Sequence, residues 1–456
     1  MKKRSLAVKM FIAMILGLVV GIGFLTLRES LISSGQAGTW TMINNLLFQD
    51  VTAEGAEQAL GIFYIIGQLF VNALQLIMIP MVFVSIVLAV GTITDTKKLG
   101  RISMKTIGFF LGTKVLGIAL AASVGMIIYQ MGLFNTVVDG LAVSAGSTGS
   151  NPMAIILKVV PNNIVSVFGD NGRVLSIVFL AVVVGLTLNK INSKTSTIKN
   201  LCEELNKVIT VFLGFIVNKF GPITIFCLLS RTFAMYGVSH LKPALTYIIT
   251  VVLSLLFFLL VVYPTIIVVL GKVSPIPFIK KIAKVAVFAF STSSSAATLP
   301  LNQKTATEEL GISEEVASFI LPLGMTINMD GTAIMQVIAT IFIAGCAGYE
   351  LTITTLLLIG VLALVASIAT PGAPGAGAVI LFTILTGIGL TSEAALIAYS
   401  LILAINRPVE MLVTVLNVVD DSVTAIVVGK SEGALNEEIY NATEKAITER
   451  ASKNVS

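Results

Sequence analysis

Residues 291–301 read STSSSAATLPL and residues 367–379 read SIATPGAPGAGAV, and each of these clusters interrupts a long apolar stretch. Residues 326–332, TINMDGT, place a third polar cluster inside another apolar segment. Non-helical backbone at membrane depth is tolerated only where protein buries it or where it lines a water-filled cavity. Paired interruptions of apolar segments are also a good pointer in a sequence to a binding site at the bilayer midplane. These three stretches therefore predict an enclosed ligand site.

The composition is that of a polytopic membrane protein. The chain has 456 residues, of which 56% are hydrophobic and 12% are charged, whereas soluble domains carry about 25% charged residues. Apolar runs of about 20 residues, the length that crosses a bilayer as a helix, occur repeatedly. The net charge of +5 comes from basic residues at the ends of apolar segments, which argues against nucleic-acid binding. We expect an all-α, multi-pass protein surrounded by the lipid bilayer.

Cysteine and histidine are too scarce for a metal centre or a histidine-based catalytic triad. The three cysteines, Cys202, Cys227 and Cys346, show no ligand or disulfide spacing, and His240 is the only histidine. A serine within residues 293–295 would need an activating base to act as a nucleophile, and Lys114 is the one candidate for that base. We therefore expect that the chain is not an enzyme.

The distribution of basic residues predicts the topology. Lysine and arginine cluster at 97–105, 190–199 and 272–284, and the positive-inside rule places these loops and both termini in the cytoplasm of a plasma-membrane protein. Lysines on both sides of 285–303 predict a re-entrant hairpin there. The 353–392 segment is long enough for a second, opposed hairpin, and we expect the two hairpin tips to meet near the middle of the membrane.

Polar residues recur along one face of the last apolar segment. Asn406, Glu410, Thr414, Asn417 and Asp421 follow one another at spacings of 4, 4, 3 and 4, which places them on one stripe of a helix. Charged groups at bilayer depth are costly and mark substrate or ion paths. Asn417 and Asp421 offer oxygen ligands for a hard monovalent cation, and we expect Asn328 and Asp330 to complete the set. The alternative is a set of polar contacts between helices.

Four motifs in this order resemble the dicarboxylate/amino acid:cation symporter family, which includes glutamate transporters and neutral amino-acid exchangers. The motifs are SSSAATLP at 293–300, NMDGT at 328–332, PGAG at 374–377 and the stripe with Asn417 and Asp421. MIPMVF at 78–83 is similar to a further family motif, so the resemblance covers nearly the whole chain. It implies eight transmembrane helices plus two opposed re-entrant helical hairpins, assembled as a homotrimer.

The resemblance also implies a division into a fixed scaffold and a mobile transport domain that moves as an elevator. The expected boundaries are scaffold at 1–102 and 134–236, a transport-domain helix at 103–133, the transport domain at 237–430, with hairpins at about 280–305 and 353–392, and a cytoplasmic tail at 431–456. Alternating charged and small residues in that tail predict a solvated helix.

Family roles carry over residue by residue. Ser295 and Asn417 would hold the α-carboxylate of an amino-acid substrate, Glu410 its ammonium group, and the tip at 374–377 would close as a gate. The expected substrate-binding residues are Ser294, Ser295, Thr332, Gly375, Ala376, Gly377, Glu410, Val413, Thr414 and Asn417. One sodium site would use Gly324, Asn328, Asn417 and Asp421, with Asp330 nearby, and a second would use Thr326, Ser367, Ile368 and Thr370, largely through backbone carbonyls.

Departures from the family pattern point to the substrate. Members that transport acidic substrates carry an arginine at the position of Val413, where it pairs with the side-chain carboxylate of the substrate. A buried carboxylate without a partner is costly, so Val413 favours a small neutral amino acid such as alanine, serine or threonine. Arg407 could replace the missing arginine, but we expect it to pair with Glu410 or Asn406.

Further departures concern the cations. The family's third sodium site corresponds to Phe110, Thr113 and Lys114, where a phenyl ring and an ammonium group cannot bind Na⁺. We expect Lys114 to occupy this place as a tethered cation balanced by Asp330, which leaves two sodium sites; a snorkelling lysine or a carrier of the coupling proton are the alternatives. Asp420 stands where most members have glycine, and we expect it to face away from Asp421; a basic partner such as Lys114 or Arg407 is open.

The sequence thus predicts a sodium-coupled symporter of a neutral amino acid that works by an elevator mechanism. Proton-coupled or sodium-independent transport of an amino acid, cystine or a dicarboxylate stays open, and so does exchange. A channel, which must release its ions quickly, is a further alternative.

Overall fold

The computed structural model describes residues 6–53, 55–91, 97–135, 159–170, 173–191, 197–237, 241–372 and 375–442. These residues form helices and no named strand; one isolated bridge joins Ile312 to Leu435. The helices of the first half are α1 (Leu6–Ser33), α2 (Ala37–Leu47), α3 (Ile62–Gly91), α4 (Lys97–Gln130), α6 (Ile164–Phe168), α7 (Val174–Ile191), α8 (Thr197–Phe215), η1 (Ile216–Phe220) and α9 (Gly221–Tyr236).

The second half contains shorter helices joined by tight connections. They are α10 (Leu241–Phe257), η3 (Phe258–Val262), α11 (Tyr263–Val269), α12 (Pro275–Thr292), α13 (Ser295–Glu308), α14 (Glu314–Ile327), α15 (Asp330–Cys346), α16 (Ile353–Ile368), α17 (Ala376–Gly387), α18 (Glu393–Ile405), α19 (Arg407–Ser431) and α20 (Glu437–Asn441). Seven stretches of the described residues are helical, long and apolar enough to cross a membrane. The expected total of eight crossings and the re-entrant path of the hairpins stay predictions.

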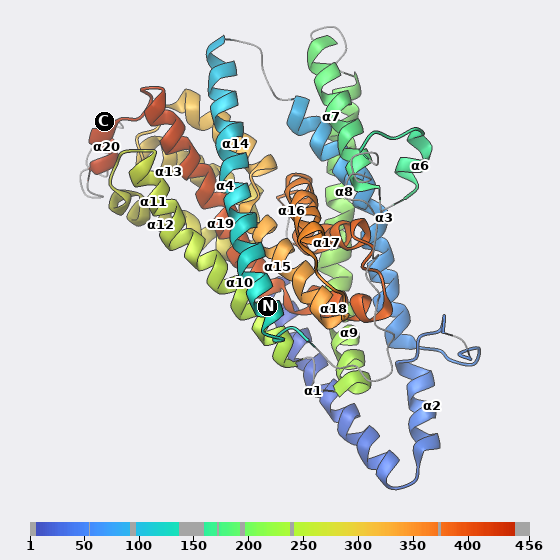
Figure 1. The fold of residues 1–456 in the computed structure, drawn as a ribbon. Helices are drawn as coiled ribbons and strands as arrows, with labels where there is room; N and C mark the ends of the chain where they lie inside the picture. The colour runs from blue at the N-terminus through green and yellow to red at the C-terminus, as the bar shows by residue number, and fades with distance from the viewer. Residues whose placement is uncertain are drawn as a thin grey trace, which may run out of the picture.

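Two groups of helices lie against each other (Figure 1). In the first group α1 packs on α9, and α3 packs on α7, α8 and α9. The second group is built around α15, which contacts α4, α10, α16 and α19 and is buried along its whole length. The groups meet where α17 contacts α3 and α18 contacts α9. Polar residues that begin α15 are therefore held deep inside the molecule.

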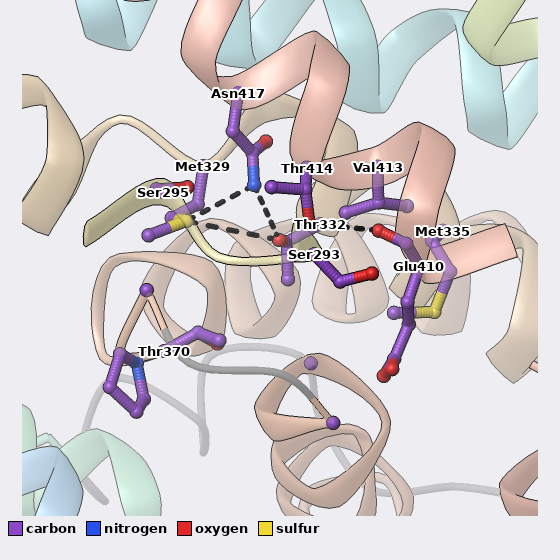
Figure 2. Close-up of a pocket in the computed structure, with 14 residues that line it drawn as sticks. Ser293, Ser295, Met329, Thr332, Met335, Thr370, Glu410, Val413, Thr414 and Asn417 are labelled. Carbon is purple, nitrogen blue, oxygen red and sulfur yellow. Dashed lines mark hydrogen bonds between the residues drawn. The ribbon is translucent and has the colours of Figure 1, made fainter. Parts of the chain in front are cut away.

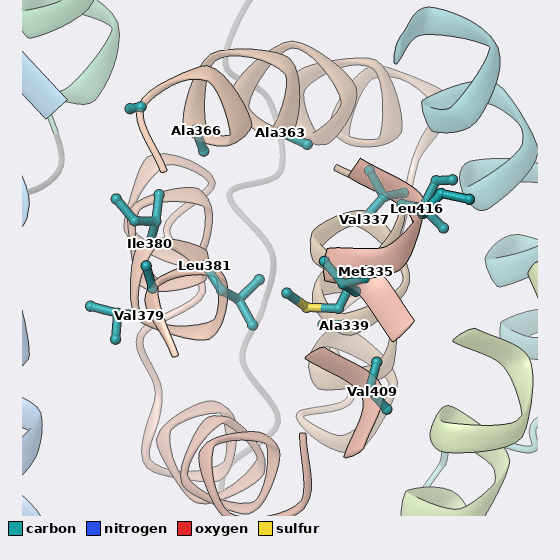
Figure 3. Close-up of a cluster of buried hydrophobic side chains, with 14 of the residues drawn as sticks. Met335, Val337, Ala339, Ala363, Ala366, Val379, Ile380, Leu381, Val409 and Leu416 are labelled. Atoms are coloured by element: carbon teal, nitrogen blue, oxygen red, sulfur yellow. The ribbon is translucent and has the colours of Figure 1, made fainter. Parts of the chain in front are cut away.

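The core of the second group is a compact apolar cluster. Figure 3 shows Met335, Val337 and Ala339 of α15 together with residues of α16, α17 and α19. Small residues such as Ala363 and Ala366 of α16 let these helices approach closely, as is usual where helices pack inside a membrane. This packing fixes the position of the helix ends that surround the polar residues.

Each interrupted segment forms two helices joined by a short turn. Ser293 joins α12 to α13 with a left-handed backbone (φ 49°), and the side chain of Ser294 caps α13 by accepting a hydrogen bond from the Ala297 amide at 3.2 Å. Between α16 and α17, the described part of the connection ends at Gly375 with φ 88°. Ser294 Oγ donates to the carbonyl oxygen of Gly372 at 3.1 Å. This contact brings the two tips together, as expected, while their position near the middle of the membrane stays a prediction.

The interruptions are shorter than the sequence suggests. In the first, only Ser293 and Ser294 are non-helical, because α13 continues through Pro300. In the second, α17 already begins at Ala376, while residues 373 and 374 lie outside the described part of the chain, as does His240. The third interruption is the step from α14 to α15 at Asn328 and Met329.

The segment after α19 forms the short helix α20, which agrees with the expected tail helix, but it is not solvated on all sides: it is held against neighbouring helices through the buried Tyr440. Tyr440 is fully buried and donates through its hydroxyl to the Ser274 carbonyl at 2.7 Å. Lys281 Nζ donates to the carbonyl oxygens of Glu309, Ile439 and Tyr440. The composition of charged and small residues in this segment does not predict these apolar and carbonyl contacts. Residues 443–456 lie outside the described part.

Glu432, just after α19, ties this segment to α4. Its carboxylate accepts hydrogen bonds from Arg101 Nε at 3.0 Å and from Lys105 Nζ at 2.6 Å. These bonds, the one from Arg101 first, lower the pKa of Glu432 to about 2 from an ordinary value of 4.5. Because the pKa is lowered on folding, the stabilisation is complete above about pH 4.5 and disappears as the pH falls toward 2.

We expect Glu432→Gln to lower the free energy of unfolding at neutral pH by less than about 1 kcal/mol, since its partners are exposed to solvent. The difference should shrink at high ionic strength because salt screens the ion pairs. Melting temperatures of the purified protein at low and high salt measure both effects. Glu438→Gln, in the same segment, is the matched control, and an equal loss for this variant would contradict the assignment.

Candidate functional site

A pocket lies where the two hairpin tips, the start of α15 and the middle of α19 come together (Figure 2). Eight of the ten expected substrate-binding residues line it, and these are Ser295, Thr332, Gly375, Gly377, Glu410, Val413, Thr414 and Asn417. Of the other two, Ser294 makes the contact between the tips and Ala376 is fully buried in the first turn of α17. The sequence therefore identified most of the wall of this pocket.

The remaining lining residues are Ser293, Met329, Met335, Thr370, Pro371 and Gly372. Thr370 was expected at a sodium site and not at the pocket. Met335 could have been found from its position one helical turn after Thr332, since residues three apart lie on the same face of a helix. Met329 had no such signal because it lies in the break between α14 and α15.

Two helix N-termini border the pocket. Ser294 and Ser295 begin α13, and Gly375 and Ala376 begin α17. The first amide groups of a helix have no partner inside the helix, and the helix dipole adds positive potential there. Two such ends beside one pocket favour an anionic group such as a carboxylate.

Asn417 connects the pocket to the break before α15. Its Oδ1 accepts a hydrogen bond from the Gly331 amide at 2.8 Å, and its Nδ2 donates to Thr332 Oγ at 3.1 Å. A side chain at Gly331 would lie 2.7 Å from the Val413 carbonyl oxygen, so only glycine lets α15 begin this close to α19. The amide of Asn417 is thereby held at the pocket wall.

Glu410 and Arg407 form a buried ion pair, which confirms the expected pairing of Arg407. Arg407 Nη1 lies 3.2 Å from Glu410 Oε2, and Glu410 Oε1 accepts a hydrogen bond from the Ala378 amide at 3.4 Å. Asn406 makes a different contact, because its Oδ1 accepts a hydrogen bond from the Tyr247 hydroxyl at 2.6 Å. Arg407 lines a neighbouring, mostly apolar pocket that also includes Glu410 and residues of α3 and α9.

Among the described residues that line the pocket between the tips, Glu410 alone has a charged side chain. Val413 is 5% exposed and presents its methyl groups at the wall. The pocket can thus hold one ammonium group at Glu410 and one carboxylate at the helix N-termini, beside an apolar wall.

Lys114 lies in a second polar cluster, next to the break between α14 and α15. Its side chain is 1% exposed, which contradicts the alternative of a lysine that snorkels to the membrane surface. Nζ donates to the carbonyl oxygen of Ile327 at 2.8 Å and interacts electrostatically with Asp330, Asp420 and Asp421. The nearness of Lys114 to Asp330 agrees with the expected charge balance.

The expectation that Asp420 faces away from Asp421 is wrong. Asn328 Nδ2 donates to Asp420 Oδ2 at 2.7 Å and to Asp421 Oδ1 at 3.0 Å. Thr113 Oγ also donates to Asp420 Oδ2, at 3.3 Å. Adjacent residues of a helix point about 100° apart, but a donor that sits between them can reach both carboxylates. Tyr263 was also missed, although its hydroxyl is buried without a hydrogen-bond partner and interacts with the same carboxylates.

The donors of the first expected sodium site are largely brought together. Gly324 lies so close to Asp421 that a side chain there would collide with the Asp421 carboxylate, and Asn328 bonds to the same carboxylate. Asn417 is instead engaged with Gly331. Among the described residues, no three His, Cys, Asp or Glu side chains form a metal ligand set, so a cation here would need carbonyl and amide oxygens as well. Sodium accepts such hard oxygen ligands.

Residues of the second expected sodium site lie at two helix C-termini. Thr326 is in the last turn of α14, and Ser367 and Ile368 are in the last turn of α16. The hydroxyls of Thr326, Ser367 and Thr370 all donate to backbone carbonyls within their own segments. The last carbonyls of a helix lack intrahelical partners and carry negative potential, which suits a cation held by backbone oxygens.

A helical membrane protein with a polar pocket enclosed by broken helices and hairpin tips is, by fold and site, a membrane transporter for a small molecule. The sequence profile of the sodium:dicarboxylate symporter family matches residues 6–431. The chain therefore belongs to this family, and it is a cation-coupled symporter and not an enzyme, as expected.

Relatives with established names are similar over most of their length. The proton/sodium-glutamate symport protein of Bacillus caldotenax is 27% identical over 445 residues, which cover 96% of this chain and 97% of that protein. The proton/glutamate-aspartate symporter of Escherichia coli K12 is 29% identical over 381 residues, 80% of this chain and 84% of that protein. A C4-dicarboxylate transport protein of Burkholderia ambifaria is 29% identical over 378 residues, 81% and 86% of the two chains.

We expect Gly324→Ala to weaken the stabilisation of the protein by sodium, because the added methyl group displaces the Asp421 carboxylate and also lies 3.1 Å from Phe110. The shift in melting temperature between sodium and choline chloride should fall to less than half of the wild-type shift. Gly112→Ala is the matched control, since a side chain there meets nothing within 4 Å. An unchanged sodium-dependent shift in Gly324→Ala would argue against a cation at this place.

Proposed function

We propose that the protein is a sodium-coupled symporter of a small neutral amino acid. The observation that carries this proposal is the charge of the pocket. Glu410 is the only charged side chain among the described lining residues, its charge is balanced by Arg407, and Val413 leaves the side-chain wall apolar. A zwitterion adds no net charge to this arrangement. A second carboxylate on the substrate would be buried without a cation, which is costly.

The residues take the following roles in the proposal. The carboxylate of the amino acid binds at the N-termini of α13 and α17, with Ser295 and the Asn417 amide as donors. Its ammonium group binds Glu410 and shares that carboxylate with Arg407. The side chain lies against Val413, Thr332 and Met335. Thr414 faces the same space, so a small hydroxyl on the substrate finds a partner.

Cation binding and substrate binding share one segment, which supports coupling between them. Thr370, Pro371 and Gly372 line the pocket, while Ser367, Ile368 and Thr370 supply the proposed second sodium site. A cation held by the carbonyls at the end of α16 would order the connection that closes over the substrate. The other sodium ion binds near Gly324, Asn328 and Asp421, and Lys114 takes the place of a third.

The mechanism we propose is an elevator. The helices around α15, namely α4 and α10 to α19, would move together with the pocket against the group of α1 to α3 and α6 to α9. The two groups meet where α17 contacts α3 and α18 contacts α9, and the proposed sliding would take place along these contacts. A homotrimer in the plasma membrane, with both termini in the cytoplasm, is part of the same proposal.

An acidic substrate is the second candidate. The named relatives transport glutamate, aspartate or C4-dicarboxylates. Arg407 would have to leave Glu410 and turn toward the pocket to pair with the second carboxylate. Its Nε is buried without a hydrogen-bond partner, which leaves the guanidinium a free donor for such a carboxylate.

Uptake by proteoliposomes distinguishes these candidates. We expect alanine, serine or threonine to accumulate when a sodium gradient is present and not when choline replaces sodium, at two pH values. Competition by glutamate or aspartate should be weak. Sodium-dependent accumulation of a dicarboxylate in preference to every neutral amino acid would refute the neutral assignment.

Val413→Arg should shift the preference toward aspartate and glutamate by at least about tenfold, because a bidentate arginine–carboxylate pair becomes possible at the wall. Competition uptake measures the shift. Val413→Leu, which changes size without charge, is the control and should keep the neutral preference. Unchanged selectivity in Val413→Arg would count against the position of the side chain in the pocket.

A further inference from the structure

Four ionisable side chains lie together next to the break between α14 and α15. Lys114, Asp330, Asp420 and Asp421 are all buried, with Asp330 and Asp420 fully inaccessible. Lys114 interacts electrostatically with all three carboxylates, and Asp420 and Asp421 share the Asn328 amide. With the carboxylates ionised, the four side chains together carry two uncompensated negative charges.

The cluster also has more acceptors than donors. Both carboxylate oxygens of Asp330, Oδ1 of Asp420 and Oδ1 of Asn328 are buried without a hydrogen-bond partner. The Asn328 amide and the Thr113 hydroxyl already donate to the carboxylates. Buried oxygens without donors are costly, and unpaired charges at membrane depth more so. Positive charge from outside the chain is therefore needed to stabilise this arrangement.

The charges of Lys114 and two sodium ions are balanced by carboxylates only because Asp420 is present. Three positive charges lie in this region: Lys114, the sodium ion proposed near Gly324, Asn328 and Asp421, and the sodium ion proposed at the end of α14, next to the Ile327 carbonyl that receives Lys114. Asp330, Asp420 and Asp421 balance them. Without Asp420, the same three cations would face two carboxylates and leave a buried positive charge. Without Lys114, three carboxylates would call for a third ion.

We propose that Lys114 and Asp420 form a compensating pair, in which Asp420 provides the negative charge that allows the tethered ammonium group of Lys114 and two sodium ions to be buried together. The proposal rests on the sodium coupling proposed above and adds that these two residues set the number of ions. It differs from a purely structural role for Asp420, in which its only task is to accept hydrogen bonds from Asn328 and Thr113.

The number of ions can be measured without any amino acid. Sodium that binds only the folded state raises its stability in proportion to the number of ions bound. The melting temperature of the purified protein is therefore recorded against the logarithm of the sodium concentration, above the dissociation constant, with choline chloride holding total salt constant. We expect the slope to fall to about half of the wild-type value in Asp420→Asn and to rise to about one and a half times that value in Lys114→Gln. The double variant should return to the wild-type slope.

Matched controls remove one charge of the same sign outside the cluster. Asp50→Asn and Lys304→Gln should both keep the wild-type slope. Equal slopes in wild type and both single variants of the cluster would overturn the proposal, because a structural role for Asp420 changes stability without changing the sodium dependence. If a single variant does not fold, the double variant decides: a folded double variant with the wild-type slope supports the pair, and a double variant that is unfolded or insensitive to sodium refutes it.

The sodium-slope experiment and the uptake experiment test different proposals, so one can fail without the other. Failure of every neutral amino acid to be transported would overturn the substrate assignment and leave the sodium slopes as they are. Equal sodium slopes in all variants would overturn the compensating pair, while sodium-dependent uptake of a neutral amino acid could still be observed.

Discussion

The Asn328 amide, which donates to Asp420 and Asp421 at once, is the interaction on which the centre of this structure depends. It fastens the break between α14 and α15 to the side of α19. From this break the Ile327 carbonyl receives Lys114, and the Gly331 amide receives Asn417. The cluster of Lys114, Asp330, Asp420 and Asp421 and the pocket between the hairpin tips are therefore positioned by the same few residues around one helix break.

Helix N-termini favour an anion and helix C-termini favour a cation, and this structure places both kinds of end near its centre. N-termini of α13 and α17 border the pocket, whereas C-termini of α14 and α16 carry the carbonyls proposed for sodium. Backbone groups thus supply potential of both signs within a short distance. Because backbone dipoles carry no net charge, few buried ionised side chains are needed, and within the described residues those present are paired, as Arg407 and Glu410 are, or gathered in the cluster around Lys114.

The sequence predicted the features that depend on spacing along one segment. The stripe from Asn406 to Asp421 faces the interior, and the interrupted segments form helix pairs, because helical periodicity and helix-breaking residues act locally. The meeting of the two tips followed instead from the expectation of opposed hairpins. Features that depend on distant segments were not predictable. Asp420 was placed wrongly because its partner Asn328 is 92 residues away, Tyr263 of α11 gave no periodic signal, and the burial of Tyr440 needs a cleft built by other helices.

The ion pair of Arg407 and Glu410 has a consequence for how the protein responds to voltage. An electric field across the membrane acts on net charge that moves. A pocket that contains this pair is electrically neutral when empty, and it stays neutral when a zwitterion enters. For the neutral amino acid proposed above, the membrane potential would therefore perform no net work on the substrate itself. It would drive accumulation only through the cations proposed to move with the pocket.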